Sequence, residues 1–153
     1  RGHAGRGVPR RRAELRREGR SGLLLLAFGT MVAPCVSIAD RLDATLVNMR
    51  FVKPLDVELL RRLAATHLAV VTVEENVVAG GAGSAVNEAL AAAGLTLPAR
   101  NIGLPDGFVE HGTREDCLEM AGLDAASLER SIAAFWRSRQ PTRVIAAAAS
   151  SAG

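Results

Sequence analysis

The segment from Val71 to Ser84 constrains the fold of this chain more than any other stretch. It starts as a β-branched apolar run and ends in an alanine-rich stretch with helical character. Between the two lie a pair of carboxylates and three glycines: Glu74, Glu75, Gly80, Gly81 and Gly83. A buried strand, a glycine turn and a helix form the repeating unit of parallel α/β sheets. The segment therefore predicts an α/β fold.

Strand-like and helix-like segments alternate along the rest of the chain. The run Leu23 to Phe28 is wholly apolar, as in a strand buried on both faces. Further strands are expected at 44–48, 68–73 and 99–103. Helices are expected at 34–42, 54–63, 84–93, 113–120 and 124–137. We therefore predict a three-layer α-β-α fold around a mainly parallel sheet of about five strands.

In such sheets, functional sites lie beyond the carboxyl ends of the strands. Three loops are expected to project there, at 29–33, 74–83 and 103–112. A dinucleotide site needs its glycines directly after the strand, but here Glu74 and Glu75 intervene and would repel a phosphate. Neighbouring residues of a strand point to opposite faces, so the two carboxylates cannot share a substrate proton. We expect one of them to point inward and accept backbone N–H bonds.

Positive charge is concentrated at the N-terminus. Residues 1–20 hold eight arginines and two glutamates, whereas the remainder holds 11 basic and 14 acidic residues. Such an arm could contact an anionic partner, or it could be a solvated linker. We expect an Arg-rich interdomain linker at 1–21, the α/β domain at 22–137 and a disordered tail at 138–153. The chain begins with Arg rather than Met, so we also expect a piece of a longer protein.

Several functional classes are disfavoured by composition. Aromatic residues make up 3% of the chain, too few for base-stacking platforms, so nucleic acid is not expected as a partner. The longest apolar run has six residues, 23–28, while a membrane span needs about 20. Cys35 and Cys117 form no CxxC or zinc pattern, which indicates buried thiols in the cytoplasm. His3, His67 and His111 lie apart in the sequence, so no metal site is expected.

Four motifs in this order closely resemble the C-terminal domain of the 1-deoxy-D-xylulose-5-phosphate synthase family. They are FGTMV at 28–32, MRFVKPLD at 49–56, TVEEN at 72–76 followed by GGAGSAVNE at 80–88, and NIGLPD at 101–106. The second and fourth motifs point to the synthase in particular. A looser form of the third occurs across transketolase C-terminal domains. One departure is Asn48, where the family often has Asp, so an ion pair from that position to Arg50 is in doubt.

The resemblance implies a parent enzyme of three domains that acts as a homodimer with thiamine diphosphate and Mg²⁺. That enzyme joins a two-carbon unit from pyruvate to glyceraldehyde 3-phosphate, with release of CO₂, for isoprenoid and thiamine synthesis. Its cofactor and catalytic residues belong to the first two domains. This chain alone is accordingly expected to bind no cofactor or metal and to be inactive. Its partners would be the remaining domains and a second copy of the enzyme.

The same resemblance gives roles to a few residues of this chain. Arg1-Gly2 matches the end of a Pro-Arg-Gly segment whose Arg binds the aldehyde's phosphate. Glu74, Glu75 and the glycines at 80, 81 and 83 are expected to hold structure or an interface rather than a ligand. Two alternatives stay open. One is the C-terminal domain of another thiamine enzyme, such as a transketolase or a pyruvate dehydrogenase beta subunit. The other is a stand-alone α/β binding module with a basic arm.

Overall fold

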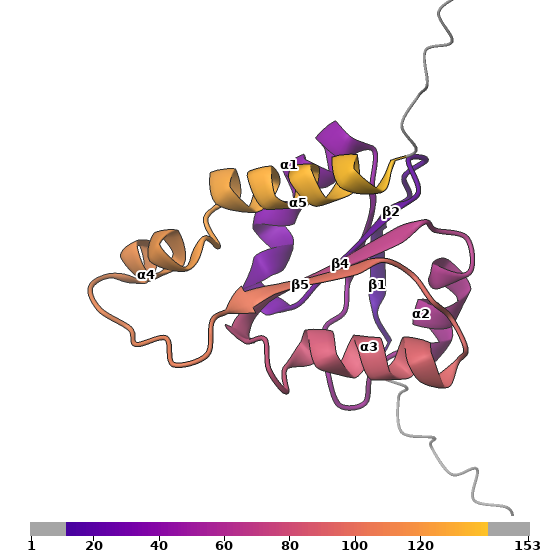
Figure 1. Ribbon diagram of the computed structural model, residues 1–153, viewed down its shortest axis with the longest axis horizontal. Helices are drawn as coiled ribbons and strands as arrows, with labels where there is room; N and C mark the ends of the chain where they lie inside the picture. The colour runs from indigo at the N-terminus through magenta and orange to yellow at the C-terminus, as the bar shows by residue number, and fades with distance from the viewer. Residues whose placement is uncertain (1–11, 141–153) are drawn as a thin grey trace, which may run out of the picture.

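A five-stranded sheet runs through the middle of the molecule with helices on both of its faces (Figure 1). The structure is a computed structural model and describes residues 12–140. The strands are β1 (Glu14–Arg17), β2 (Leu23–Ala27), β3 (Thr45–Asn48), β4 (Ala69–Val77) and β5 (Ala99–Leu104). The helices are the 3₁₀ turn η1 (Gly29–Met31) and α1 (Val32–Leu42), α2 (Val57–Ala64), α3 (Ala82–Ala92), α4 (Arg114–Ala121) and α5 (Ala125–Arg139). The strand order is β1-β3-β2-β4-β5, and only β1 is antiparallel to its neighbour. The predicted fold class is confirmed.

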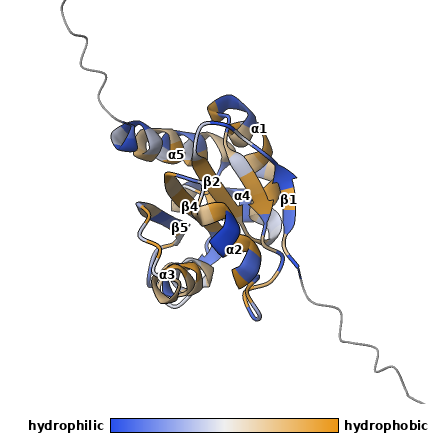
Figure 2. Cartoon of the chain, turned by 90° about the vertical axis from the view of Figure 1, so that its right-hand side faces the viewer, coloured by the Kyte–Doolittle hydropathy of each residue, from blue (hydrophilic) through white to orange (hydrophobic). Residues whose placement is uncertain are grey.

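The central strand β2 is buried on both faces, as its apolar sequence predicted. Alternate residues of β2 enter two separate cores: Leu23, Leu25 and Ala27 face one side, and Leu24 and Leu26 face the other. The first core lies under α1 and α5 and includes Trp136. The second lies under α2 and α3. Figure 2 shows hydrophobic colouring along the central strands and hydrophilic colouring on the outer side of α2.

Local capping signals placed several helix ends correctly. Asp124 caps α5, and Thr113 with Asp116 forms a capping box at α4, as expected. Helix α2 was expected from residue 54 but begins at Val57, with Asp56 as its N-cap. Helix α3 was expected from residue 84 but begins at Ala82, with Gly81 as its N-cap. Strand β4 also runs on to Val77 rather than ending at Val73, so the two glutamates belong to the strand.

Strand β1 was not expected, because it lies inside the Arg-rich segment 1–21. It pairs with β3, with Glu14 opposite Asn48 and Leu15 opposite Val47. Arg17 holds the strand against the end of α1: its guanidinium donates to Asp40 and Asp43, both at 3.0 Å, and to the Ala44 carbonyl at 2.9 Å. These acceptors are more than 20 positions away in sequence. The contacts that hold β1 therefore leave no local signal, such as an alternating apolar pattern, in the Arg-rich segment.

The two ends of the chain extend past the described residues. Arg1, and residues 141–153 of the expected tail, lie outside them, while α5 continues through Ser138 to Arg139. Within residues 12–140, no helix combines the length and the apolar character that crossing a bilayer requires.

Candidate functional site

The carboxyl ends of β2, β3, β4 and β5 meet at one edge of the sheet, because these strands are parallel. The loops after β2, β4 and β5 leave this edge as predicted. The loop at 49–56 after β3 joins them there, which the sequence analysis did not include. Since β1 is antiparallel, its first residue Glu14 also lies at this edge, opposite Asn48. The chain therefore enters the domain beside the same loops.

Glu74 is completely buried and closes the N-terminus of α3. Its carboxylate oxygens accept the Ala82 N–H at 2.8 Å and the Gly83 N–H at 3.1 Å. These are two of the donors that a helix leaves unpaired at its start, and the helix dipole favours an anion there. The expectation that one of the two carboxylates points inward is confirmed. The early start of α3 has the same cause, since Glu74 supplies the cap that no loop side chain supplies.

Each glycine of the turn has a separate structural reason. Gly80 has φ +72°, a left-handed conformation that favours glycine. A Cβ on Gly81 would lie 2.7 Å from both Glu74 oxygens and 2.4 Å from the Val77 carbonyl oxygen. A Cβ on Gly83 would lie 2.7 Å from the Thr72 hydroxyl. The glycines thus let the loop and α3 approach β4 closely, and a protein carboxylate fills the position where a phosphate would sit.

Glu75 points away from Glu74 and links three elements at the edge. Its carboxylate accepts a hydrogen bond from the Thr30 hydroxyl of η1. Arg114, the first residue of α4, places Nη2 3.0 Å from the same carboxylate. The Glu75 and Arg114 side chains are 33% and 56% exposed, so the pair adds little to stability by itself. The pair connects α4, which lies beyond the end of β5 (Figure 1), to strand β4.

A small cavity of about 170 Å³ lies beside this pair, between the β5–α4 loop and α4. It is lined by Glu75, Leu104, Phe108, Glu110, Gly112, Arg114, Cys117 and Leu118. Ligand pockets for small molecules usually measure about 300–1,000 Å³. The cavity is therefore too small for a substrate and cofactor together. Cys117 donates to the His111 carbonyl at 3.3 Å, so the thiol helps to fold the loop.

The remaining candidate groups serve the fold. The His67 ring contacts the Leu63 carbonyl oxygen at 2.6 Å and the Thr45 hydroxyl at 2.7 Å. Cys35 is fully buried, and this burial raises the pKa of its thiol to about 12. Among residues 12–140, no group of three or more His, Cys, Asp or Glu side chains could hold a metal ion.

The loop 49–56 contacts the start of strand β1 through Arg50. Arg50 has φ +57° and donates its backbone N–H to the Asn48 side chain at 3.0 Å. Its guanidinium is 2.7 Å from Glu14, whose pKa this hydrogen bond lowers. The ion pair of Arg50 is thus with Glu14 of β1, and its contact with position 48 is the backbone hydrogen bond to Asn48. Sequence reasoning missed this contact, and its only signal was an acidic residue within the Arg-rich segment.

Comparison with known proteins identifies what the chain is similar to. The family model described as "Transketolase, C-terminal domain" matches residues 11–128. The 1-deoxy-D-xylulose-5-phosphate synthase of Methylibium petroleiphilum is 56% identical over 128 residues, which are 82% of this chain and 20% of that protein. The synthase of Cupriavidus metallidurans is 52% identical over 146 residues, 92% of this chain and 23% of that protein. The chain thus spans about a fifth of the length of these curated relatives.

Two solved structures have a similar fold. A split-gene transketolase, described as an inactive beta4 tetramer, matches with a TM-score of 0.75 and 34% identity, over 84% of this chain and 43% of that chain. Transketolase from Leishmania mexicana matches with a TM-score of 0.59 over 86% of this chain and 19% of that chain. At 19% identity, the second match shows the fold alone.

Proposed function

This chain belongs to the transketolase C-terminal domain family, and we propose that it is the C-terminal domain of a 1-deoxy-D-xylulose-5-phosphate synthase. The observation that carries the proposal is the identity of 52–56% to synthases of that name over 82–92% of this chain. The family model alone would also fit a transketolase. The two motifs MRFVKPLD and NIGLPD favour the synthase.

The complete enzyme would decarboxylate pyruvate and join the two-carbon unit to glyceraldehyde 3-phosphate for isoprenoid and thiamine synthesis. It would act in the cytoplasm as a homodimer with thiamine diphosphate and Mg²⁺. Both cysteines, Cys35 and Cys117, are free thiols, which supports a reducing location. The preceding domains would supply the cofactor site, and Arg1, outside the described residues, would bind the phosphate of the aldehyde.

The described residues of this chain do not fit thiamine diphosphate. A diphosphate would be held best at a helix N-terminus after a glycine turn, yet the Glu74 carboxylate already occupies the start of α3. Glu75 adds a second negative charge at the same edge. We therefore assign this domain a scaffold role, in which it packs on the preceding domain and supports the dimer. The split-gene transketolase described as inactive gives this assignment support from a related protein.

Titration calorimetry tests the scaffold assignment. The 153-residue chain is titrated with thiamine diphosphate in the presence of Mg²⁺, and the complete enzyme is titrated in parallel as the control. The proposal expects saturable heat only from the complete enzyme. Tight, Mg²⁺-dependent binding by the chain alone would overturn it.

A further inference from the structure

Strand β5 ends the sheet on the side opposite β1, and no strand of the described residues 12–140 lies beyond it (Figure 2). The Val70 N–H donates to the Pro98 carbonyl at 3.0 Å, and the Val78 N–H donates to the Leu104 carbonyl at 3.1 Å. Both acceptors stand at even-numbered positions. Because successive residues of a strand direct their backbone groups to opposite sides, β5 faces β4 at its even-numbered positions and faces outward at its odd-numbered ones.

Three residues of β5 therefore direct their N–H and C=O groups away from the sheet: Ala99, Asn101 and Gly103. Within residues 12–140, the backbone hydrogen bonds of the loops do not involve these three residues. Ala99 is exposed and the other two are half-buried, whereas the first six residues of the neighbouring strand β4 are buried. Such a row of outward donors and acceptors is a template on which another strand can pair.

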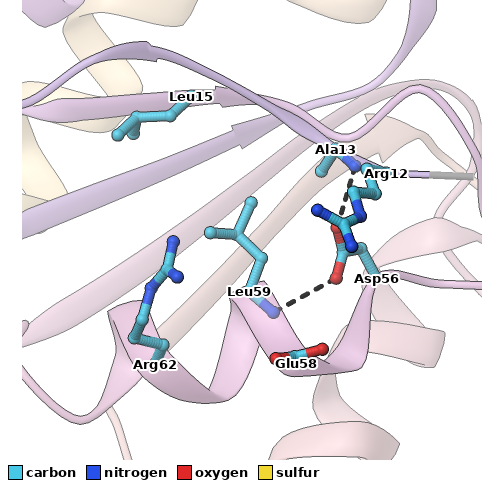
Figure 3. Close-up of a pocket in the computed structure, with 7 residues that line it drawn as sticks. All are labelled: Arg12, Ala13, Leu15, Asp56, Glu58, Leu59 and Arg62. Atoms are coloured by element: carbon cyan, nitrogen blue, oxygen red, sulfur yellow. Dashed lines mark hydrogen bonds between the residues drawn. The ribbon is translucent and has the colours of Figure 1, made fainter. Parts of the chain in front are cut away.

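The other edge strand, β1, has features that hinder such pairing. Three of its four residues are charged, namely Glu14, Arg16 and Arg17, and its register with β3 is irregular. Charged side chains and bulges are the common means by which sheet edges avoid pairing with another chain. The Ala13 N–H before the strand donates to the Asp56 carboxylate at 2.9 Å, and charged side chains line the cleft of about 240 Å³ beside it (Figure 3).

Strand β5 lacks these features. Its single charged residue is Arg100, and no proline stands between Pro98 and Pro105. The register shift in its pairing with β4 places the extra residues in β4, so β5 itself stays regular. The two edges of the sheet therefore differ, and β5 is the edge that can accept a partner strand.

The outward edge of β5 is complementary to itself in one register. In an antiparallel pair centred on Asn101, Ala99 lies opposite Gly103 of the other copy, and each of the three facing pairs would exchange two hydrogen bonds. Arg100 then lies opposite Ile102, and its aliphatic stem can pack on that apolar side chain. A pair centred on Arg100 would instead set two like charges directly opposite each other, which is destabilising. Two-fold symmetry requires this kind of self-complementary surface.

We propose that β5 is a dimerisation strand, which pairs in antiparallel orientation with β5 of a second copy of this chain and joins the two sheets into one. The inference deepens the scaffold role assigned above. It rests on the proposed function in one respect, namely that in the complete enzyme the second copy is the other subunit of the homodimer.

The first test is amide hydrogen exchange by NMR, measured on the 153-residue chain at low and at high protein concentration. Exchange of the Ala99, Asn101 and Gly103 amides is expected to slow about tenfold as the concentration rises, because these N–H groups become paired. The Arg100 and Ile102 amides face β4 at every concentration, so their exchange should change by less than about twofold. Equal slowing at all five positions, or no dependence on concentration, would overturn the proposal.

The second test measures the dissociation constant of the dimer by analytical ultracentrifugation. Ala99→Pro removes one outward N–H and leaves the pairing with β4 intact, so the dissociation constant should rise about tenfold while the urea midpoint stays unchanged. Met120→Ser is the control, because this side chain is 65% exposed on α4 and takes no part in the pairing. A wild-type chain that stays monomeric, or an equal loss in Met120→Ser, would contradict the inference. Should Ala99→Pro fail to fold, the exchange test on the wild-type chain still decides.

Neither measurement uses a substrate. A complete protein that makes no 1-deoxy-D-xylulose 5-phosphate would therefore refute the proposed function and leave the pairing of β5 in place. A monomeric 153-residue chain would refute the pairing alone.

Discussion

The Glu74 carboxylate and the Gly81 backbone fit together so closely that a Cβ on Gly81 would lie 2.7 Å from both carboxylate oxygens. The same carboxylate closes the N-terminus of α3 through Ala82 and Gly83. The glycine turn is thus shaped around a buried protein anion. This relationship distinguishes the turn from a phosphate-binding loop of similar sequence.

Replacing Gly81 by Ala should destabilise the domain by about 3 kcal/mol, because the added methyl group meets backbone oxygen as well as Glu74. Gly80→Ala is the control. Gly80 has φ +72°, and a Cβ added there would have no atom within 4 Å. Gly80→Ala should therefore cost only about 1 kcal/mol of unfolding free energy, from backbone strain. Urea unfolding followed by circular dichroism measures both changes. Equal losses for the two variants would show that the close approach to Glu74 has no energetic weight.

Glu74→Gln should cost about 2 kcal/mol of unfolding free energy, because the amide keeps one acceptor and leaves a buried N–H of α3 unpaired. The same change at Glu75 should cost less than about 1 kcal/mol, since its partners are largely exposed. Chemical unfolding of the two variants side by side makes the comparison. A larger loss at Glu75 would contradict the assignment of Glu74 as the buried cap.

Arg17→Ala should lower the thermal midpoint at pH 7, because it removes the contacts of β1 with Asp40, Asp43 and the Ala44 carbonyl. The Arg17 hydrogen bond lowers the pKa of Asp43 below its ordinary 3.8. The stabilisation is therefore fully present above that pH and is lost as pH falls through the folded-state pKa. The difference in thermal midpoint between wild type and variant should narrow from pH 7 to pH 2, leaving the contribution of the Ala44 carbonyl contact. Arg16→Ala, whose contact with Glu14 is 3.6 Å, should change little at any pH.

Cys35 should resist alkylation while the domain is folded, because it is fully buried and its pKa is raised to about 12. Cys117 is partly exposed and should be labelled first. In the unfolded chain the Cys35 thiol ionises with a pKa of about 9.0, whereas burial keeps the thiol protonated in the folded domain to higher pH. The free energy of unfolding should therefore fall as the pH rises above about 9. Mass spectrometry after a short iodoacetamide pulse gives the result. Rapid labelling of Cys35 at neutral pH would show that the first core is open.

Sequence reasoning succeeded where the deciding interactions are local. The apolar run of β2 and the capping residues Thr113 and Asp124 act on residues only a few positions away, so the sequence pattern predicts these elements directly. It failed where the partner is distant: β1 depends on acceptors such as Asp40, and the start of α3 depends on Glu74, eight positions before Ala82. The inward orientation of one glutamate followed from strand alternation, but the contacts of Glu75 with Thr30 and Arg114 required the fold.

A product assay on the complete protein that contains this domain tests whether that protein is a 1-deoxy-D-xylulose-5-phosphate synthase. The full open reading frame is expressed and supplied with pyruvate, glyceraldehyde 3-phosphate, thiamine diphosphate and Mg²⁺, with the 153-residue chain assayed beside it. The complete protein should release CO₂ and form 1-deoxy-D-xylulose 5-phosphate only when both substrates are present, and the 153-residue chain should show no turnover. Transfer of a two-carbon unit from a ketose phosphate without use of pyruvate would contradict it.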